Sequence, residues 1–237
     1  MKRCVKMFKE IAQKKIYLQI LDQIKENIIE GNLKKGDRLP SERQWSEQLG
    51  VSRATIREAI RALEMIGLVK CKQGEGNFIA ENFEDTLTQP LTIMFWLSNG
   101  KYNEIQELRR ALETEAAMLA AEHMTSEKYE IIENICKAIE IETDETIRAT
   151  LDKRFHYEIA MASENTLIKN VLASSSALIE ALIKDIRVAI LLDPHRGALI
   201  DQQHRNILLA LRKGEPLKAA MAMSQHMDLI DDFISAL

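Results

Sequence analysis

Four residues in the C-terminal half of the sequence carry metal-ligating side chains at a spacing that could bring them together. Asp152 and His156 stand four residues apart in LDKRFHYEIA, so a helix would place both on one face. His204 in DQQHRNILLAL and His226 in MSQHMDLI fall in the last two predicted helices. Three imidazoles and one carboxylate that converge inside a helical bundle would suit Zn, Ni or Mn and could leave coordination positions open. Spacing alone also permits histidines that lie at the surface or cap helices, because such Asp/His pairs are common.

A second group of candidate residues lies in LPSERQWSEQLGVSRATIREAIRALEMIGLV, Leu39 to Val69. Ser52, Arg53, Thr55 and Arg57 gather at the start of a predicted helix, where backbone amides and the helix dipole favour phosphate. Arg53 and Arg57 stand one turn apart, and the planar fork of arginine can bind guanine edges or phosphates through two hydrogen bonds. The simpler alternative for each arginine is that it only solvates the outer face of the helix.

The elements predicted around these basic residues follow one plan. A helix from Lys15 to about Glu30 comes first, and a short second helix begins with a cap at Ser41. Ser52 caps a third helix, and strands Leu68–Lys72 and Asn77–Ala80 form a hairpin with a glycine-bearing tip. Helix, helix, turn, helix and hairpin is the plan of a winged helix-turn-helix, which holds the start of its third helix in a major groove.

Composition and charge agree with a nucleic-acid-binding module on a larger domain. The 237 residues are 46% hydrophobic and 29% charged, as is ordinary for a soluble globular protein. Residues 1–80 carry 16 Lys and Arg against 10 Asp and Glu, a net charge of +6, whereas residues 81–237 carry 16 against 26, a net charge of −10. A basic module on an acidic remainder suggests a polyanionic partner, although an uneven surface charge without a partner is the alternative.

Several sequence features indicate an intracellular protein. Cys4, Cys71 and Cys136 show no paired spacing and are predicted to be free thiols in a reducing cytosol. No signal peptide is convincing, and no run approaches the roughly 20 apolar residues of a membrane helix. We therefore expect a cytoplasmic protein without a membrane partner.

The C-terminal part is predicted to be helical nearly throughout. Residues 81–90, ENFEDTLTQP, are polar, acidic and end in proline, so we expect a linker between an N-terminal domain at 1–80 and a C-terminal domain at 91–237. The periodicity predicts helices at about Leu91–Ser98, Asn103–His123, Ser126–Glu140, Glu145–Ala162, Thr166–Leu192, Gly197–Lys213 and Pro216–Ala236. The expected fold is mainly α, with an all-α bundle of six or seven helices after the winged helix-turn-helix.

The segment GDRLPSERQWSEQLGVSRATIREAIRALEMIGLVKCKQGEGNFI resembles the DNA-binding domain of the GntR family of bacterial transcription regulators, over about Ile16 to Ala80. The resemblance implies a set of DNA-contacting positions: Arg43, Ser52, Arg53, Thr55, Arg57, Gln73 and Gly74. Ala54 stands where some members have a polar contact residue, and Gln73 occupies a variable position of the wing. These two departures leave the base preference open.

The segments IQELRRALETEAAMLAA, LDKRFHYEIAMASEN and HRNILLALRKGEPLKAAMAMSQH resemble the FCD-type effector-binding domain of the FadR subgroup, over about Leu91 to Leu237. Metal-binding members of that subgroup hold a divalent ion with one Asp and three His, and the resemblance assigns this role to Asp152, His156, His204 and His226. FadR itself lacks this set and binds an acyl thioester, so a fatty acyl effector is not expected.

Two further residues are implied in effector binding. By the same resemblance, Arg109 lines the effector pocket, and Asn165 lies near it, although Asn165 also fits a helix cap. The alternative for Arg109 is a surface salt bridge with Glu113, four residues later. An arginine that points into an apolar pocket beside a metal with open positions would form a receptor for a small carboxylate.

The sequence therefore predicts a homodimeric transcription regulator, a repressor in most such proteins, that binds a double-stranded DNA operator and is controlled by a small carboxylate at a divalent-metal site. A repressor that senses the metal ion itself is one alternative. A metal-dependent enzyme is another, but there is no HExxH, no Glu-x-x-His pair and no nucleophile elbow beside the ligands.

Overall fold

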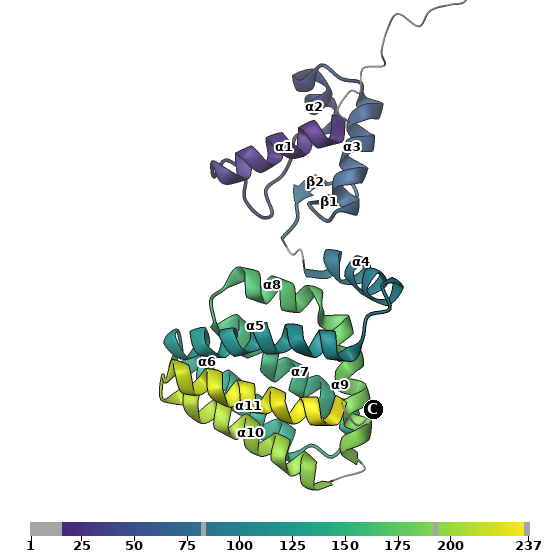
Figure 1. Cartoon of the computed structure of the whole chain (residues 1–237). Coiled ribbons are helices and arrows are strands. Elements are labelled where there is room, and N and C mark those ends of the chain that lie inside the picture. Colours follow the sequence, from purple (N-terminus) through teal and green to yellow (C-terminus); the bar gives the residue numbers. More distant parts are fainter. Residues whose placement is uncertain (1–15, 82–83, 192–193, 235–237) are drawn as a thin grey trace, which may run out of the picture. The chain divides into compact units, whose positions relative to one another are not determined.

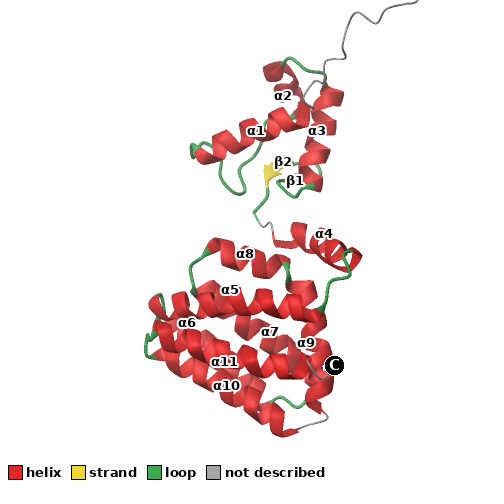
Figure 2. Ribbon diagram, viewed as in Figure 1, coloured by secondary structure: helices red, strands yellow, loops and turns green. Residues whose placement is uncertain are grey.

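The computed structural model describes residues 16–81, 84–191 and 194–234, and the chain divides into two compact units, Met1–Phe83 and Glu84–Leu237. Figure 2 shows that helices dominate and that strands occur only in the hairpin of the first unit, among the residues described. The predicted mainly α class is confirmed. Cys4 and Lys15 lie outside the described residues, whereas Cys71 and Cys136 are free thiols.

The first unit contains three helices followed by a two-stranded hairpin (Figure 1). Its elements are α1 (Ile16–Ile29), α2 (Glu42–Leu49), α3 (Arg53–Met65), β1 (Val69–Lys72) and β2 (Gly76–Ile79). The strands are antiparallel, with Val69 opposite Ile79 and Lys72 opposite Gly76. This is the predicted winged helix-turn-helix, with each element within a few residues of its expected bounds.

Local signals in the sequence fix the closely spaced pair α2 and α3. Ser41 accepts a hydrogen bond from the Gln44 amide while the Gln44 side chain accepts one from the Ser41 amide, so the capping box forms. Gly50 ends α2 in a left-handed conformation with φ of 65°, which glycine adopts without steric cost. The core of the unit, to which α1 and the hairpin also contribute, buries Trp45 of α2 and Ile56, Ile60 and Leu63 of α3.

The second unit consists of helices that surround two clusters of buried apolar residues. They are α4 (Glu84–Leu97), α5 (Tyr102–Glu122), α6 (Ser126–Ile141), α7 (Glu145–Ala162), α8 (Thr166–Ser174), α9 (Ser176–Leu191), α10 (Pro194–Arg212) and α11 (Pro216–Ile234). Helices α5 and α11 pack side by side along much of their length, and α7 and α10 also contact α5 (Figure 1). These four helices enclose the candidate metal ligands.

Two expectations for this unit were wrong in detail. Residues 81–90 were expected to form a linker, but α4 begins at Glu84 and continues through Pro90. Proline removes one helical hydrogen bond, and the helix nevertheless continues because Leu91 and Phe95 pack against the apolar cluster shared with α8 and α9.

The single helix expected over Thr166–Leu192 is divided at Ser175 into α8 and α9, which gives eight described helices instead of six or seven. Ser174 and Ser175 donate their hydroxyls to the carbonyls of Asn170 and Val171. Such bonds compete with the helical ladder and bend helices. No single helix in the described ranges is long and apolar enough to cross a membrane. Taken together, α8 and the first part of α9 are long and apolar enough, but the two parts are bent by 62° relative to each other.

Candidate metal centre and nucleic-acid interface

Three helices bring the predicted histidines together in the interior of the second unit. His156 comes from α7, His204 from α10 and His226 from α11, and their exposed fractions are 6%, 0% and 1%. Their candidate ligand nitrogens all lie within 4.8 Å of one another. The carboxylate of Asp152, one turn before His156, is also buried, and its Oδ1 lies 3.4 Å from Nε2 of His204. The alternative of surface or capping histidines is therefore excluded for these three.

The electrostatics of the cluster fit a divalent cation. Within the described part of the chain, Nε2 of His156 and Nδ1 of His226 are buried without a hydrogen-bond partner, which costs free energy unless another group binds them. Burial lowers the pKa of His226 well below its ordinary value, and the nearby His204 and His156 lower it further. A neutral imidazole is the form that ligates metals. Three imidazole nitrogens beside one carboxylate are donors that Zn, Ni and Mn accept.

Arg109 of α5 lies beside this cluster and is buried together with Glu113. Only 1% of Arg109 is exposed, and its Nε donates to Oε1 of Glu113 over 2.8 Å. The other carboxylate oxygen, Oε2, lies 2.5 Å from Nδ1 of His156. Arg109 thus points inward, and its pair with Glu113 forms in the interior, so the surface location given for that salt bridge was wrong.

Glu113 is a site residue that the sequence did not reveal as one. Burial raises the pKa of its carboxyl group, but Arg109 and His156 outweigh burial and lower that pKa to about 2. The carboxylate is therefore ionised at neutral pH and compensates the guanidinium. The spacing from Arg109 was a signal for the pair, but the contact with His156 depends on how α5 packs against α7.

Arg109 lines two cavities. The larger, about 50 Å³, exceeds the ~10–15 Å³ that one water molecule needs. Its polar lining includes Arg109, Glu113 and His156, and its apolar wall includes Ile179 and Ile183 of α9. A smaller cavity of about 10 Å³ lies against Arg109, Asp152 and His226. A small anion in the larger space would meet both the Arg109 guanidinium and apolar side chains of α9.

Asn165 does not line either of these cavities. Its Oδ1 accepts hydrogen bonds from the amides of Leu167 and Ile168, so it caps the N-terminus of α8. The helix-capping role is thus confirmed, and a contact with an effector stays a prediction.

In the first unit, the predicted DNA-contacting residues gather on α2, α3 and the hairpin tip. Ser52 caps α3 by accepting from the Thr55 amide, and its hydroxyl lies 2.8 Å from that of Thr55. Arg53 is exposed at the first turn of α3, and Gln73 is exposed at the hairpin tip. Gly74 has φ of 78°, and a Cβ at this position would meet no atom within 4 Å. A residue with a side chain would therefore be disfavoured at this position by the left-handed backbone conformation, and not by a steric clash with neighbouring atoms.

Two of the predicted DNA-contacting arginines are held by carboxylates. Arg43 pairs with Glu47 along α2 at 3.0 Å, with both side chains largely exposed. Arg57 of α3 pairs with Glu42 of α2 through three contacts of 2.8–3.2 Å. The sequence analysis had assigned no partner within the chain to Arg57, so this pairing across helices is an addition from the structure.

Comparisons with known proteins agree with both units. Residues 16–79 match the family described as bacterial regulatory proteins, gntR family, and residues 104–229 match the FCD domain. The chain is 32% identical over 207 residues to the HTH-type transcriptional regulator LutR of Bacillus subtilis (strain 168), covering 86% of this chain and 94% of that relative. It is 30% identical over 216 residues to a protein of Escherichia coli (strain K12) named "Putative L-lactate dehydrogenase operon regulatory protein", covering 90% of this chain and 83% of that relative. The solved structure of Streptococcus agalactiae GntR is similar with a TM-score of 0.69 and 27% identity, over 91% of this chain and 99% of that one.

Proposed function

The chain belongs to the GntR family of bacterial regulatory proteins and carries its FCD domain, and from this premise we propose that a small carboxylate, bound beside a divalent metal ion, controls its affinity for operator DNA. The broader function follows from the family: the chain is a DNA-binding transcription regulator and not an enzyme. Beyond the family, we assign the effector, the metal, the direction of control and the residues that act.

The proposed DNA interface consists of the start of α3, with support from α2 and the hairpin tip. We assign DNA contacts to Arg43, Ser52, Arg53, Thr55, Arg57, Gln73 and Gly74. The hydroxyls and the α3 N-terminus suit phosphates, whereas the arginines suit phosphates or guanine edges. A cytoplasmic homodimer would present two such interfaces to a palindromic operator, because a two-fold axis in the protein matches one in the DNA.

The proposed metal site consists of Asp152, His156, His204 and His226. The observation that supports it most directly is the burial of imidazole nitrogens of His156 and His226 without hydrogen-bond partners. When bound, the ion would supply positive charge and, at any open coordination position, a Lewis acid for a carboxylate oxygen.

The proposed effector is a small carboxylate, and 2-hydroxy acids are its first class to test. Arg109 and the apolar wall of α9 line a cavity suited to a short acid. One relative is named for an L-lactate dehydrogenase operon, which makes L-lactate the first candidate. We propose repression that the effector relieves, which requires that the effector bind more tightly to the arrangement of the chain that releases DNA.

A His204→Ala variant tests this proposal, with His123→Ala as the matched control. His204 is fully buried in the cluster, whereas His123 is exposed at the end of α5. We expect His204→Ala to fold, to lose bound metal in elemental analysis, and to lose the thermal stabilisation that L-lactate or a related acid gives. His123→Ala should retain both.

Metal and acid titrations of operator binding then separate the two proposed signals. If a chelator leaves acid binding and operator affinity unchanged in wild-type protein, the proposed metal–carboxylate site is wrong. If the ion alone changes operator affinity and no acid adds to the change, the protein is a metal-sensing repressor instead.

A further inference from the structure

The ion pair between Glu42 and Arg57 joins the two helices of the helix-turn-helix at its exposed face. Nε of Arg57 donates to both carboxylate oxygens of Glu42 at 3.1 and 3.2 Å, and Nη2 donates to Oε2 at 2.8 Å. The two residues are separated by 15 positions, so the contact depends on the packing of α2 against α3. The Arg57 side chain remains 58% exposed and that of Glu42 32% exposed. The pair thus occurs at a surface that solvent and partners can reach.

The contact leaves a defined part of the guanidinium available. Arginine has five N–H donors in a rigid plane. Glu42 engages the edge formed by Nε and Nη2. The end of the guanidinium, formed by Nη1 and the second N–H of Nη2, is not part of that contact. Two parallel N–H groups at this end are sufficient for the two acceptors on the edge of a guanine.

Glu42 should have two opposite effects on DNA binding. The hydrogen bond from Arg57 lowers the pKa of Glu42, and the positive charges of Arg53 and Arg61 lower it further. Glu42 is therefore ionised at neutral pH and repels phosphates. It also holds Arg57 in one orientation, which reduces the conformational freedom that the side chain loses on binding. Repulsion acts equally on every DNA sequence, whereas orientation matters only where a base presents matching acceptors.

We propose that Glu42 is a positioning residue for sequence recognition, which fixes Arg57 so that its free end meets one base edge in the operator. This role rests on the proposed contact between Arg57 and DNA. Glu42 would then lower affinity for DNA in general and raise preference for the operator.

The test is a double-mutant cycle on full-length protein with Glu42→Gln, Arg57→Ala and the combined variant. The probes are a duplex selected from a random pool by wild-type protein and a scrambled duplex of the same length, measured by fluorescence anisotropy at one salt concentration. Glu42→Gln should lower the ratio of selected-duplex to scrambled-duplex affinity by roughly tenfold, within the range for one two-bond base contact. In the Arg57→Ala background, Glu42→Gln should leave this ratio unchanged.

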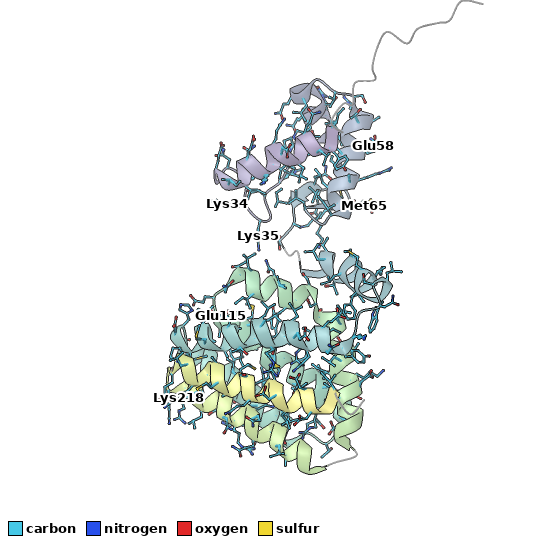
Figure 3. All side chains as sticks on the ribbon, viewed as in Figure 1. Lys34, Lys35, Glu58, Met65, Glu115 and Lys218 are labelled. Atoms are coloured by element: carbon cyan, nitrogen blue, oxygen red, sulfur yellow. The ribbon has the colours of Figure 1, made fainter. Side chains whose placement is uncertain are left out.

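Glu58→Gln is the matched control. Glu58 is exposed and lies next to Arg57 on α3 (Figure 3), and its substitution removes the same negative charge as Glu42→Gln. It should leave the ratio unchanged and raise affinity for both duplexes. If Glu42→Gln behaves like Glu58→Gln, Glu42 acts only through its charge and the proposal is overturned. The same conclusion follows if Glu42→Gln lowers the ratio equally in the Arg57→Ala background. If Arg57→Ala alone binds the selected duplex as wild type does, the proposed DNA contact of Arg57 fails, and with it the role of Glu42.

Discussion

Replacement of Glu113 by glutamine should strongly destabilise the second unit, because it removes the carboxylate that is hydrogen-bonded to the buried guanidinium of Arg109. Arg109 is 1% exposed and Glu113 3%, and Nε and Oε1 are 2.8 Å apart. Glutamine has nearly the same volume as glutamate, so the substitution changes charge without creating a cavity. The outcome therefore reports the electrostatic contribution of Glu113, through its pair with Arg109 and its contact with His156.

The magnitude follows from the separation and burial of the two charges. Unit charges about 4 Å apart attract by about 4 kcal/mol at an effective dielectric constant of about 20. Removal of one partner from a buried pair typically costs about 3–5 kcal/mol, because the remaining charge is uncompensated. We expect Glu113→Gln to lower the free energy of unfolding by about 3–5 kcal/mol. Substitution of both residues, Arg109→Met with Glu113→Leu, should recover most of this loss, since apolar replacements of buried pairs are often neutral.

Urea denaturation in the presence of a chelator measures this change without a contribution from bound metal. Trp96 lies in α4, whereas Trp45 lies in α2, so a Trp45→Phe background makes fluorescence report the second unit. Glu115→Gln is the control, because Glu115 lies two residues further along α5 and is exposed (Figure 3). It should change stability by less than about 0.5 kcal/mol. A loss below about 1 kcal/mol for Glu113→Gln would refute the view that Arg109 depends on Glu113 for its burial.

Three further variants or reactions test other parts of the chain. Arg53→Ala should weaken operator binding. If Arg53 contacts phosphate, the substitution should also reduce the slope of log affinity against log salt by about one, measured by anisotropy at several salt concentrations. An unchanged affinity would show that Arg53 is not part of the DNA interface. Asn165→Ala should cost about 1 kcal/mol of stability in denaturation through loss of the α8 cap, and a simultaneous loss of acid binding would place it in the effector site. Burial and Glu64 raise the pKa of Cys71 to about 11, so its thiolate fraction at pH 8 is about 100-fold below that of a thiol with the ordinary pKa of 9.0. Alkylation followed by mass spectrometry should show slow modification of Cys71 despite its exposure, and faster modification in Glu64→Gln.

Features that depend on neighbours within about four residues were predictable from the sequence. Ser52 caps α3 and Asn165 caps α8 through bonds to amides two or three residues later. Asp152 and His156 are one helical turn apart, which predicted that their side chains lie on the same face of α7, and both are buried. In each case the helix period is sufficient to relate the residues.

Features that depend on packing between distant elements were not predictable. The Glu42–Arg57 pair requires α2 to cross α3, and the contact of Glu113 with His156 requires α5 to meet α7. The helical course of α4 through Pro90 also depends on packing, because the sequence signal of proline favours a break. The spacing of Arg109 and Glu113 indicated their pairing, but only the bundle determines that the pair is buried.

The buried pair also constrains how an anionic effector can bind. Glu113 already compensates Arg109, so an acid at Arg109 must compete with an ionised carboxylate at 2.8 Å or share the guanidinium with it. His226 is neutral at physiological pH because its pKa is well below the ordinary value, and so it supplies no positive charge. Lys153 also lines the larger cavity, but its charge is paired with Glu180. A carboxylate desolvated among these groups therefore needs a further cation, since burial of an unpaired charge is costly. In the proposed site that cation is the metal ion, and acid binding should therefore weaken strongly when a chelator removes it, even though Arg109 remains in place.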